Sequence, residues 1–242
     1  MTNHNAEELQ LNYARVAGFM YLLIIIIGVL NGIFIDSELI VSGNKAATAN
    51  NILANDFLFR TGIASILILY VSVVILAWAL YVILKTVNKN LALLAMLLRS
   101  GEAILGGATV LISFIVLLLL NAEDYSTIFE KEQLQALAGL FLNVRDVSID
   151  IVLIFVGIGG TIFCYLFFKS SYIPRILALW GIFTYMSMLL LALINILFPN
   201  RPEMMETVLF TLGALFELLI GFWLLFKGVN FQQEDVYASG SA

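Results

Sequence analysis

The sequence predicts an all-α membrane protein built as a bundle of six transmembrane helices. Hydrophobic residues make up 62% of the 242 residues and charged residues only 12%, whereas a soluble domain has about 45–50% and about 25%. The hydrophobic residues gather in six runs of the length that a helix needs to cross a bilayer, about 20 residues. The sequence pI of about 4.8 argues against nucleic acid as a partner, because nucleic-acid binding requires a basic patch.

The six predicted spans follow one another between polar connections of unequal length. Residues 36–60 predict a loop and then a short helix capped near Asn44. Residues 121–147 carry leucines at helical spacing, so we expect a helix there that continues into the fourth span and extends it outside the membrane. Residues 1–13 and 231–242 are predicted polar tails. The spans are expected at 16–35, 61–84, 91–120, 148–168, 176–198 and 207–226.

Lysine and arginine in the connections predict the orientation, because short cytoplasmic loops carry more of them. The connections on one side of the membrane hold six such residues, and those on the other side hold four. We therefore expect both termini in the cytoplasm. The inner residues are Arg15, Lys85, Lys89, Lys169, Arg175 and Lys227, and the outer ones are Lys45, Arg60, Lys131 and Arg201.

The chain offers few side chains for metal binding or nucleophilic catalysis. It has one cysteine, Cys164 in an apolar run, and one histidine, His4 near the N-terminus. One cysteine cannot form an intrachain disulfide. The single histidine, in the polar N-terminal segment, argues against a zinc site, a histidine-ligated haem and a Ser-His-Asp triad. We expect no catalytic residue of these kinds, no metal site and no cofactor.

Three charged residues lie deep inside the predicted spans: Arg99 and Glu102 in the third and Glu217 in the sixth. At about 1.5 Å per residue they are roughly 15–20 Å from the inner helix ends, near the midplane. A charge there costs about 2.5–3.5 kcal/mol, so we expect Arg99 to pair with Glu102, Glu217 or both. Gly213 and Gly221 flank Glu217 on one helix face, which allows another helix, expected to be the third span, to come close. Fully ionised, the group carries one net negative charge, so one glutamate is a candidate to hold a proton or meet a cation.

A second set of polar residues lies nearer the outer face and predicts a vestibule that leads down to this charged group. The alternative is that the charged members of the set simply lie among lipid headgroups. The predicted vestibule residues are Asn31, Arg60, Arg145, Asp146, Asp150 and Asn195.

The leading functional prediction is that the protein binds a small molecule, an ion or a lipid in an outward-facing polar cavity. Such binding would serve transport or sensing of the ligand. Arg99 would hold an anionic group or neutralise a carboxylate, and Glu102 or Glu217 would carry a proton or meet a cation. One alternative is a lipid-modifying enzyme in which Asp146 and Asp150 bind Mg²⁺ and a lipid diphosphate. Another is an accessory or immunity protein whose charged group is purely structural. The expected partners are the bilayer and the ligand.

Six short stretches carry a family resemblance through their order and spacing. With them the chain resembles, over roughly residues 14–230, a family of bacterial membrane proteins called DUF4386, a domain of unknown function. The resemblance implies six helices in the inner membrane and no particular activity, and the family pattern includes residues that match Arg60, Arg99, Glu102 and Glu217. VRDVSID at 144–150 departs from that pattern. The stretches are ARVAGFMYLLIIIIGV at 14–29, ATANNILANDFLFRTGI at 47–63, VNKNLALLAMLLRSGEAIL at 87–105, LQALAGLFL at 134–142, SSYIPRILA at 170–178 and FELLIGFWLLFKGVN at 216–230.

Overall fold

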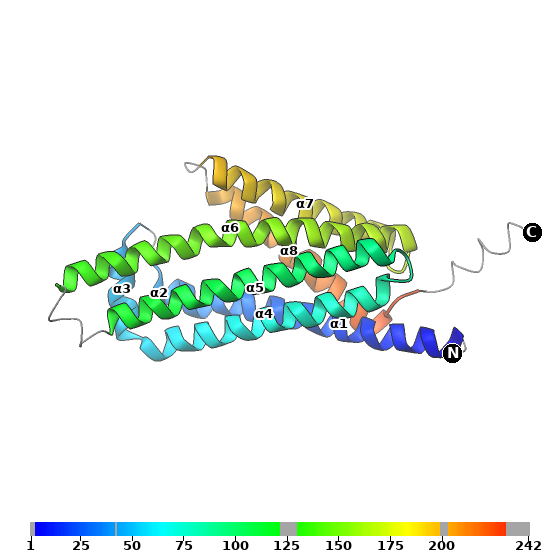
Figure 1. The fold of residues 1–242 in the computed structure, drawn as a ribbon, viewed down its shortest axis with the longest axis horizontal. Coiled ribbons are helices and arrows are strands. Elements are labelled where there is room, and N and C mark those ends of the chain that lie inside the picture. The colour runs from blue at the N-terminus through cyan, green and yellow to red at the C-terminus, as the bar shows by residue number, and fades with distance from the viewer. Residues whose placement is uncertain (1–2, 42, 122–129, 199–202, 231–242) are drawn as a thin grey trace, which may run out of the picture. The chain divides into compact units, whose positions relative to one another are not determined.

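The computed structural model describes residues 3–41, 43–121, 130–198 and 203–230 (Figure 1). Within these ranges all regular secondary structure is helical, and six helices are long and apolar enough to cross a membrane. The predicted all-α class and the six spans are therefore confirmed, whereas the predicted C-terminal tail lies outside the described residues. The six helices are α1 (Asn3–Asn31), α4 (Asp56–Leu84), α5 (Lys89–Leu120), α6 (Lys131–Ser170), α7 (Arg175–Leu197) and α8 (Glu203–Phe222).

Shorter helical segments lie between or after these helices. α2 (Ser37–Leu39) and α3 (Lys45–Ala54) occupy the connection at 36–60. The Oδ1 atom of Asn44 accepts a hydrogen bond from the backbone N–H of Ala47 at 2.9 Å, so the predicted N-cap of α3 is confirmed. π-helical turns follow α1 at Gly32–Asp36 (η1) and α8 at Trp223–Lys227 (η3).

Helix α6 is one unbroken helix of 40 residues, about twice the length that crosses a bilayer (Figure 1). The prediction that the helix in 131–147 runs on into the fourth span is therefore confirmed, while the side of the membrane on which it extends stays a prediction. Helices α1 and α4 begin at Asn3 and Asp56, before the predicted starts at 16 and 61. Hydropathy locates the apolar part of a helix, but the helical backbone continues into polar residues.

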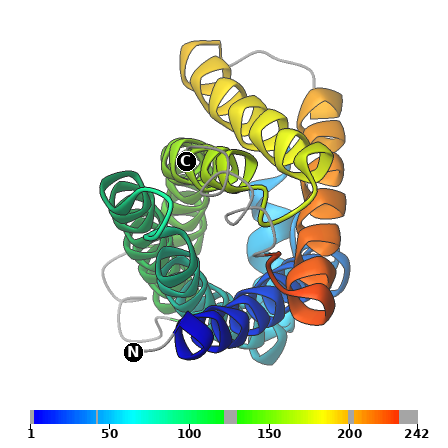
Figure 2. The ribbon, with the colours of Figure 1, turned by 90° about the vertical axis from the view of Figure 1, so that its right-hand side faces the viewer.

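The described chain divides into two compact units, and unit 1 comprises the described residues within 1–25, 72–102 and 153–230. Its core is rich in aromatic rings, with Phe163, Tyr185 and Phe216 almost fully buried. Helices α7 and α8 pack side by side (Figure 2). A Cβ atom at Gly18 of α1 would overlap the backbone of Leu225 in η3 and that of Gly221 in α8, so α1 lies directly against the end of α8 and the turn that follows it (Figure 2).

Unit 2 comprises residues 26–71 and 103–152. Its apolar core includes Leu39, Phe59 and Leu117, which lie on three different helices. Gly106 of α5 is required here, because the ring of Tyr70 occupies the space that a Cβ atom would need. Unit 2 therefore has a core of its own, separate from the aromatic core of unit 1.

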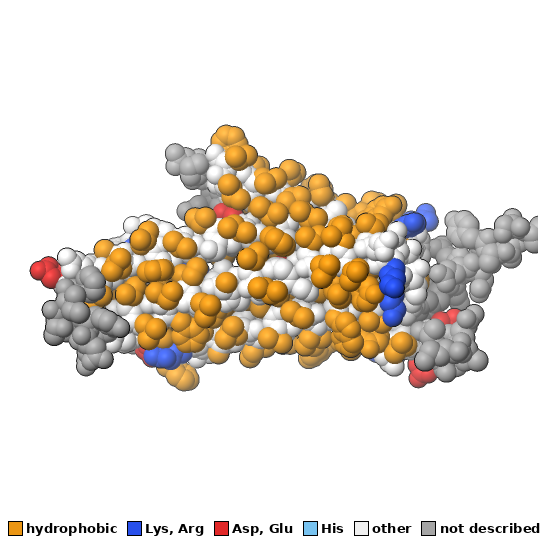
Figure 3. Space-filling model, in the orientation of Figure 1, with side chains coloured by type: hydrophobic (Ala, Val, Ile, Leu, Met, Phe, Trp, Pro, Cys, Tyr) orange, Lys and Arg blue, Asp and Glu red, His pale blue; other side chains and the backbone are white. Residues whose placement is uncertain are grey.

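Hydrophobic side chains cover most of the helical surface visible in Figure 3, and the visible Lys and Arg side chains lie near helix ends. Large apolar side chains point outward along the helices, for example Ile104, Leu118 and Phe183, each more than half exposed. A soluble protein rarely exposes large continuous apolar surfaces of this kind. The architecture is that of a multi-pass membrane protein.

Candidate functional site

The charged group of unit 1 is centred on an ion pair within helix α5. Arg99 and Glu102 are three residues apart, and Nη1 of Arg99 lies 2.8 Å from Oε2 of Glu102. The two side chains are only 5% and 6% exposed, so the pair is almost completely buried. Gly159 of α6 makes room for it, because a Cβ atom there would lie 3.1 Å from Cγ of Arg99. Of the two partners expected for Arg99, the structure shows Glu102.

Glu217 of α8 is held by a tyrosine. The hydroxyl of Tyr185, on α7, donates a hydrogen bond to Oε1 of Glu217 at 3.0 Å. The ring of Tyr185 also lies beneath Arg99, with Cζ of the guanidinium 5.9 Å from the ring centroid, within the range of a cation–π interaction. Tyr185 thus connects the Arg99–Glu102 pair to Glu217. Among the described residues, no Lys or Arg lies within 4.0 Å of the Glu217 carboxylate.

The position of Tyr185 depends on small residues in α6. A Cβ atom at Gly160 would overlap the tyrosine ring, and one at Gly157 would crowd the backbone carbonyl of Tyr185. Phe216 packs edge-on against the ring, with centroids 5.7 Å apart. The ring is therefore fixed by packing, and its hydroxyl is aimed at Glu217. Close glycine contacts of this kind let polar side chains from different membrane helices meet.

The neighbours of Glu217 on α8 differ from the expectation. The atom nearest to a Cβ at Gly213 belongs to Met188 of α7, and the nearest atoms to one at Gly221 belong to Leu22 of α1. The glycines therefore accommodate α7 and α1, rather than the third span. Hydropathy and small-residue spacing show that a helix can be approached, but they do not show by which helix.

Two members of the group were missed from the sequence: Tyr21 and Tyr185, which are 3% and 1% exposed. Tyr21 interacts electrostatically with Arg99 and Glu217. A signal for Tyr185 was present, since it lies ten residues from Arg175, as Glu217 lies ten residues from Lys227. The depth argument applied to charged residues finds this tyrosine as well, and a buried tyrosine hydroxyl usually has a polar partner.

The predicted vestibule residues are divided between the two units. Asn195 belongs to unit 1 and the other five to unit 2. Asn31 exchanges hydrogen bonds with Ser65, at 2.8 and 3.2 Å. Arg60 is about half exposed and pairs with Asp56 at 2.6 Å. Asp150 is half-buried on α6.

Arg145 and Asp146 are adjacent on α6 and contact each other at 3.3 Å. Asp146 also lies 3.8 Å from Nζ of Lys45. Arg145 and Asn31 line the same cavity in unit 2, whereas Arg60, Asp146 and Asp150 are not among its lining residues. Across the described parts of the chain, no set of three His, Cys, Asp or Glu side chains is arranged to hold a metal ion.

The family model described as Domain of unknown function (DUF4386) matches residues 16–228. This match covers most of the chain and confirms the resemblance of its short patterns. No curated protein and no solved structure matches the chain.

Proposed function

We propose that this chain, which belongs to the DUF4386 family, binds a small molecule, an ion or a lipid within the bacterial inner membrane. The charged part of the site is Arg99, Glu102 and Glu217, reached from the outer side of the membrane. Binding at this depth suits a transporter or a sensor, because the ligand must enter the protein rather than rest on its surface.

The observation that carries the proposal is the arrangement of one arginine and two glutamates in the apolar core of unit 1. The Arg99–Glu102 pair is neutral as a unit. Glu217 is left with an uncharged donor, Tyr185, as its hydrogen-bonding partner. Ionisable residues are rare inside membrane spans, and those that occur there often lie on the pathway of a ligand or a proton. A proton or a bound cation on Glu217 would neutralise the group.

A second polar group, on α7 next to Tyr185 in the sequence, supports the same hypothesis. The hydroxyl of Thr184, which precedes Tyr185 on α7, is buried and has no hydrogen-bond partner among the described residues. Buried polar atoms normally have a protein or water partner. Its Cγ2 atom lies 3.5 Å from the place of a Cβ atom at Gly213, one turn before Glu217 on α8, and a ligand or water molecule there would supply a partner. In this arrangement Arg99 holds an anionic group or neutralises a carboxylate, and Glu217 or Glu102 carries the exchangeable proton.

The two alternatives have less support. A lipid-modifying enzyme needs Asp146 and Asp150 to bind a metal ion, yet the Asp146 carboxylate already contacts Lys45 and Arg145. An accessory protein with a structural charged group predicts the same ion pair, so the experiment below separates it from a ligand-binding site.

The test compares thermal unfolding of the purified full-length chain with that of Glu217→Gln in detergent, at about pH 5 to 8. The probes are sodium and potassium salts, alkyl amines and bacterial phospholipids. A probe that raises the melting temperature of the wild type but not of Glu217→Gln supports the proposal. The matched control is Glu38→Gln on α2, which removes an exposed carboxylate and should respond like the wild type. Unfolding of the wild type that no probe and no change of pH alters would favour a structural role.

A further inference from the structure

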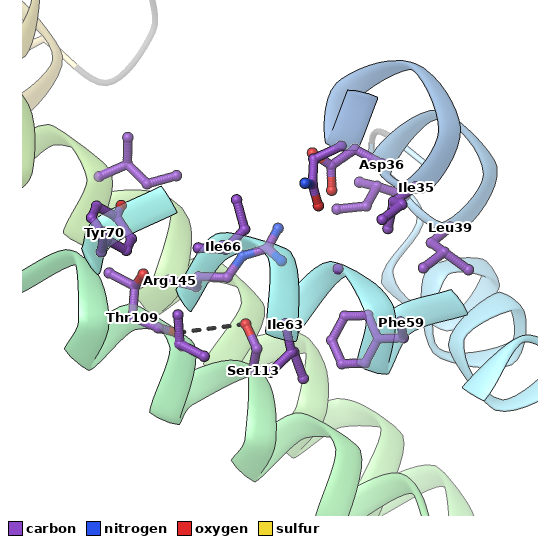
Figure 4. Close-up of a pocket in the computed structure, with 15 residues that line it drawn as sticks. Ile35, Asp36, Leu39, Phe59, Ile63, Ile66, Tyr70, Thr109, Ser113 and Arg145 are labelled. Atoms are coloured by element: carbon purple, nitrogen blue, oxygen red, sulfur yellow. Dashed lines mark hydrogen bonds between the residues drawn. The ribbon is translucent and has the colours of Figure 1, made fainter. Parts of the chain in front are cut away.

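Unit 2 contains a cavity of about 160 Å³ whose lining residues all belong to that unit (Figure 4). Most of its wall is apolar and is formed by isoleucine, leucine and phenylalanine side chains from α2, α4 and neighbouring segments. Its polar groups are Asn31, Asp36, Tyr70, Thr109, Ser113 and Arg145. This site shares no residue with the Arg99 group, so the inference does not rest on the function proposed above.

Arg145 is the central polar side chain of this cavity. In Figure 4 its guanidinium points across the cavity toward the side on which Asp36 lies. Its Nη2 contacts Asp146, but its buried Nε has no hydrogen-bond partner in the described chain. A buried guanidinium N–H without a partner is costly. An acceptor placed in the cavity would satisfy it.

Asp36 supplies the opposite charge. It lies in the π-helical turn Gly32–Asp36, and such turns are frequent at functional sites. The charge of Arg145 acts on Asp36, but the two side chains do not form an ion pair within 4.0 Å. Within the described residues, the Asp36 carboxylate makes no hydrogen bond. The cationic Arg145 and the anionic Asp36 therefore line the same cavity without contacting each other.

The volume limits the size of the ligand. An apolar cavity of about 150 Å³ holds a benzene-sized molecule, and drug-sized ligands occupy about 300–1,000 Å³. The cavity therefore accommodates a group of roughly six to eight non-hydrogen atoms. A larger molecule can place only one end in it.

The charges select the chemistry of that group. An anion alone would be attracted by Arg145 but repelled by Asp36 and Asp146, and a cation alone would be repelled by Arg145. An apolar group would leave Nε of Arg145 without a partner. A zwitterion satisfies both sides, since its anionic end can accept from Arg145 while its ammonium donates to Asp36.

We propose that this cavity binds a small zwitterionic group with its phosphate or carboxylate on Arg145 and its ammonium on Asp36. A phosphoethanolamine group has this chemistry, either as the headgroup of a phospholipid or as a free compound. The cavity distinguishes it from the headgroup of phosphatidylglycerol, which carries the phosphate but lacks the ammonium.

The test measures lipid binding to the full-length chain by native mass spectrometry. The wild type should retain phosphatidylethanolamine more strongly than phosphatidylglycerol. Arg145→Gln should weaken phosphatidylethanolamine binding about tenfold to a hundredfold, which is the worth of a hydrogen bond to a charged group. Asp36→Asn should reduce the preference over phosphatidylglycerol, because it removes both the ammonium partner and the repulsion of anions. Arg175→Gln is the control, since Arg175 is an exposed arginine of unit 1 and does not line the cavity.

Competition on the wild type keeps the proposal testable if a variant fails to fold. Free phosphoethanolamine should displace the bound lipid, whereas ethanolamine or glycerol phosphate alone should not. Free phosphoethanolamine that binds and stabilises the chain without lipid would identify a soluble zwitterion as the source, whereas displacement only at high concentration would identify the lipid. The proposal is overturned if phosphatidylglycerol binds as tightly as phosphatidylethanolamine, or if Arg145→Gln and Asp36→Asn bind like the wild type.

Discussion

Breaking the Arg99–Glu102 pair should destabilise the protein strongly, and removing both partners should not. The two side chains are only 5% and 6% exposed, and Nη1 of Arg99 lies 2.8 Å from Oε2 of Glu102. Arg99→Met leaves the Glu102 carboxylate without a cation, and loss of one partner of a buried pair costs about 3–5 kcal/mol. The double variant Arg99→Met, Glu102→Met replaces the pair with apolar chains of similar length, a change that is often neutral or stabilising by about 1–4 kcal/mol.

The assay is a double-mutant cycle on thermal unfolding in detergent. For chains of about this length, 1 kcal/mol corresponds to about 2–4 °C, so Arg99→Met should lower the melting temperature by roughly 6–20 °C. Glu102→Met should have a smaller effect, because Glu217 interacts electrostatically with Arg99 and can partly compensate. The double variant should lose less stability than Arg99→Met alone, although Glu217 then also lacks the nearby charge of Arg99. If its loss instead equals the sum of the two single losses, the two residues are not coupled and the reasoning fails.

Three other predictions test separate parts of the fold. Gly106→Ala should lower the free energy of unfolding by about 1–3 kcal/mol, because the added methyl group overlaps the ring of Tyr70. The control Gly107→Ala places a methyl group where nothing lies within 4 Å, so it should leave the free energy of unfolding unchanged or raise it by up to about 1 kcal/mol. Equal melting temperatures for the two variants would contradict the packing at Gly106. Asn44→Ala should weaken the start of α3 by about 0.5–2 kcal/mol, seen as faster hydrogen exchange at the Ala47 amide, and Asn44→Asp should preserve the slow exchange. A reporter that is active only in the cytoplasm should be active when fused to either terminus, and activity of a periplasm-specific reporter there would reverse the orientation.

Much of the architecture was predictable because membrane insertion depends on local composition. Runs of about 20 apolar residues located all six spans, and Asn44 marked the start of α3. The leucines at helical spacing in residues 121–147 indicated that a helix continues into the fourth span, as α6 does. Hydropathy could not locate the polar first turns of α1 and α4, because helical hydrogen bonding continues beyond the apolar residues.

The candidate site was predictable only in part. Residue depth placed Arg99, Glu102 and Glu217 in one layer and left Glu102 and Glu217 both open as partners of Arg99, and the structure shows the ion pair with Glu102. The hydrogen bond from Tyr185 to Glu217 was not predictable, because it requires Gly157 and Gly160 of α6 to admit the tyrosine ring. These contacts join residues from three helices, and the sequence does not show which faces of these helices meet.

The sequence by itself thus determined that this is a membrane protein, how many spans it has and which residues need polar partners inside the membrane. These properties are sums over neighbouring residues, and the cost of placing a charge or an open backbone group in hydrocarbon makes them independent of the detailed fold. Only the tertiary structure decided that Tyr185 holds Glu217, and that Arg145 and Asp36 line one cavity. Those arrangements depend on which helix faces meet, and close packing of particular side chains selects them among many pairings of similar hydropathy.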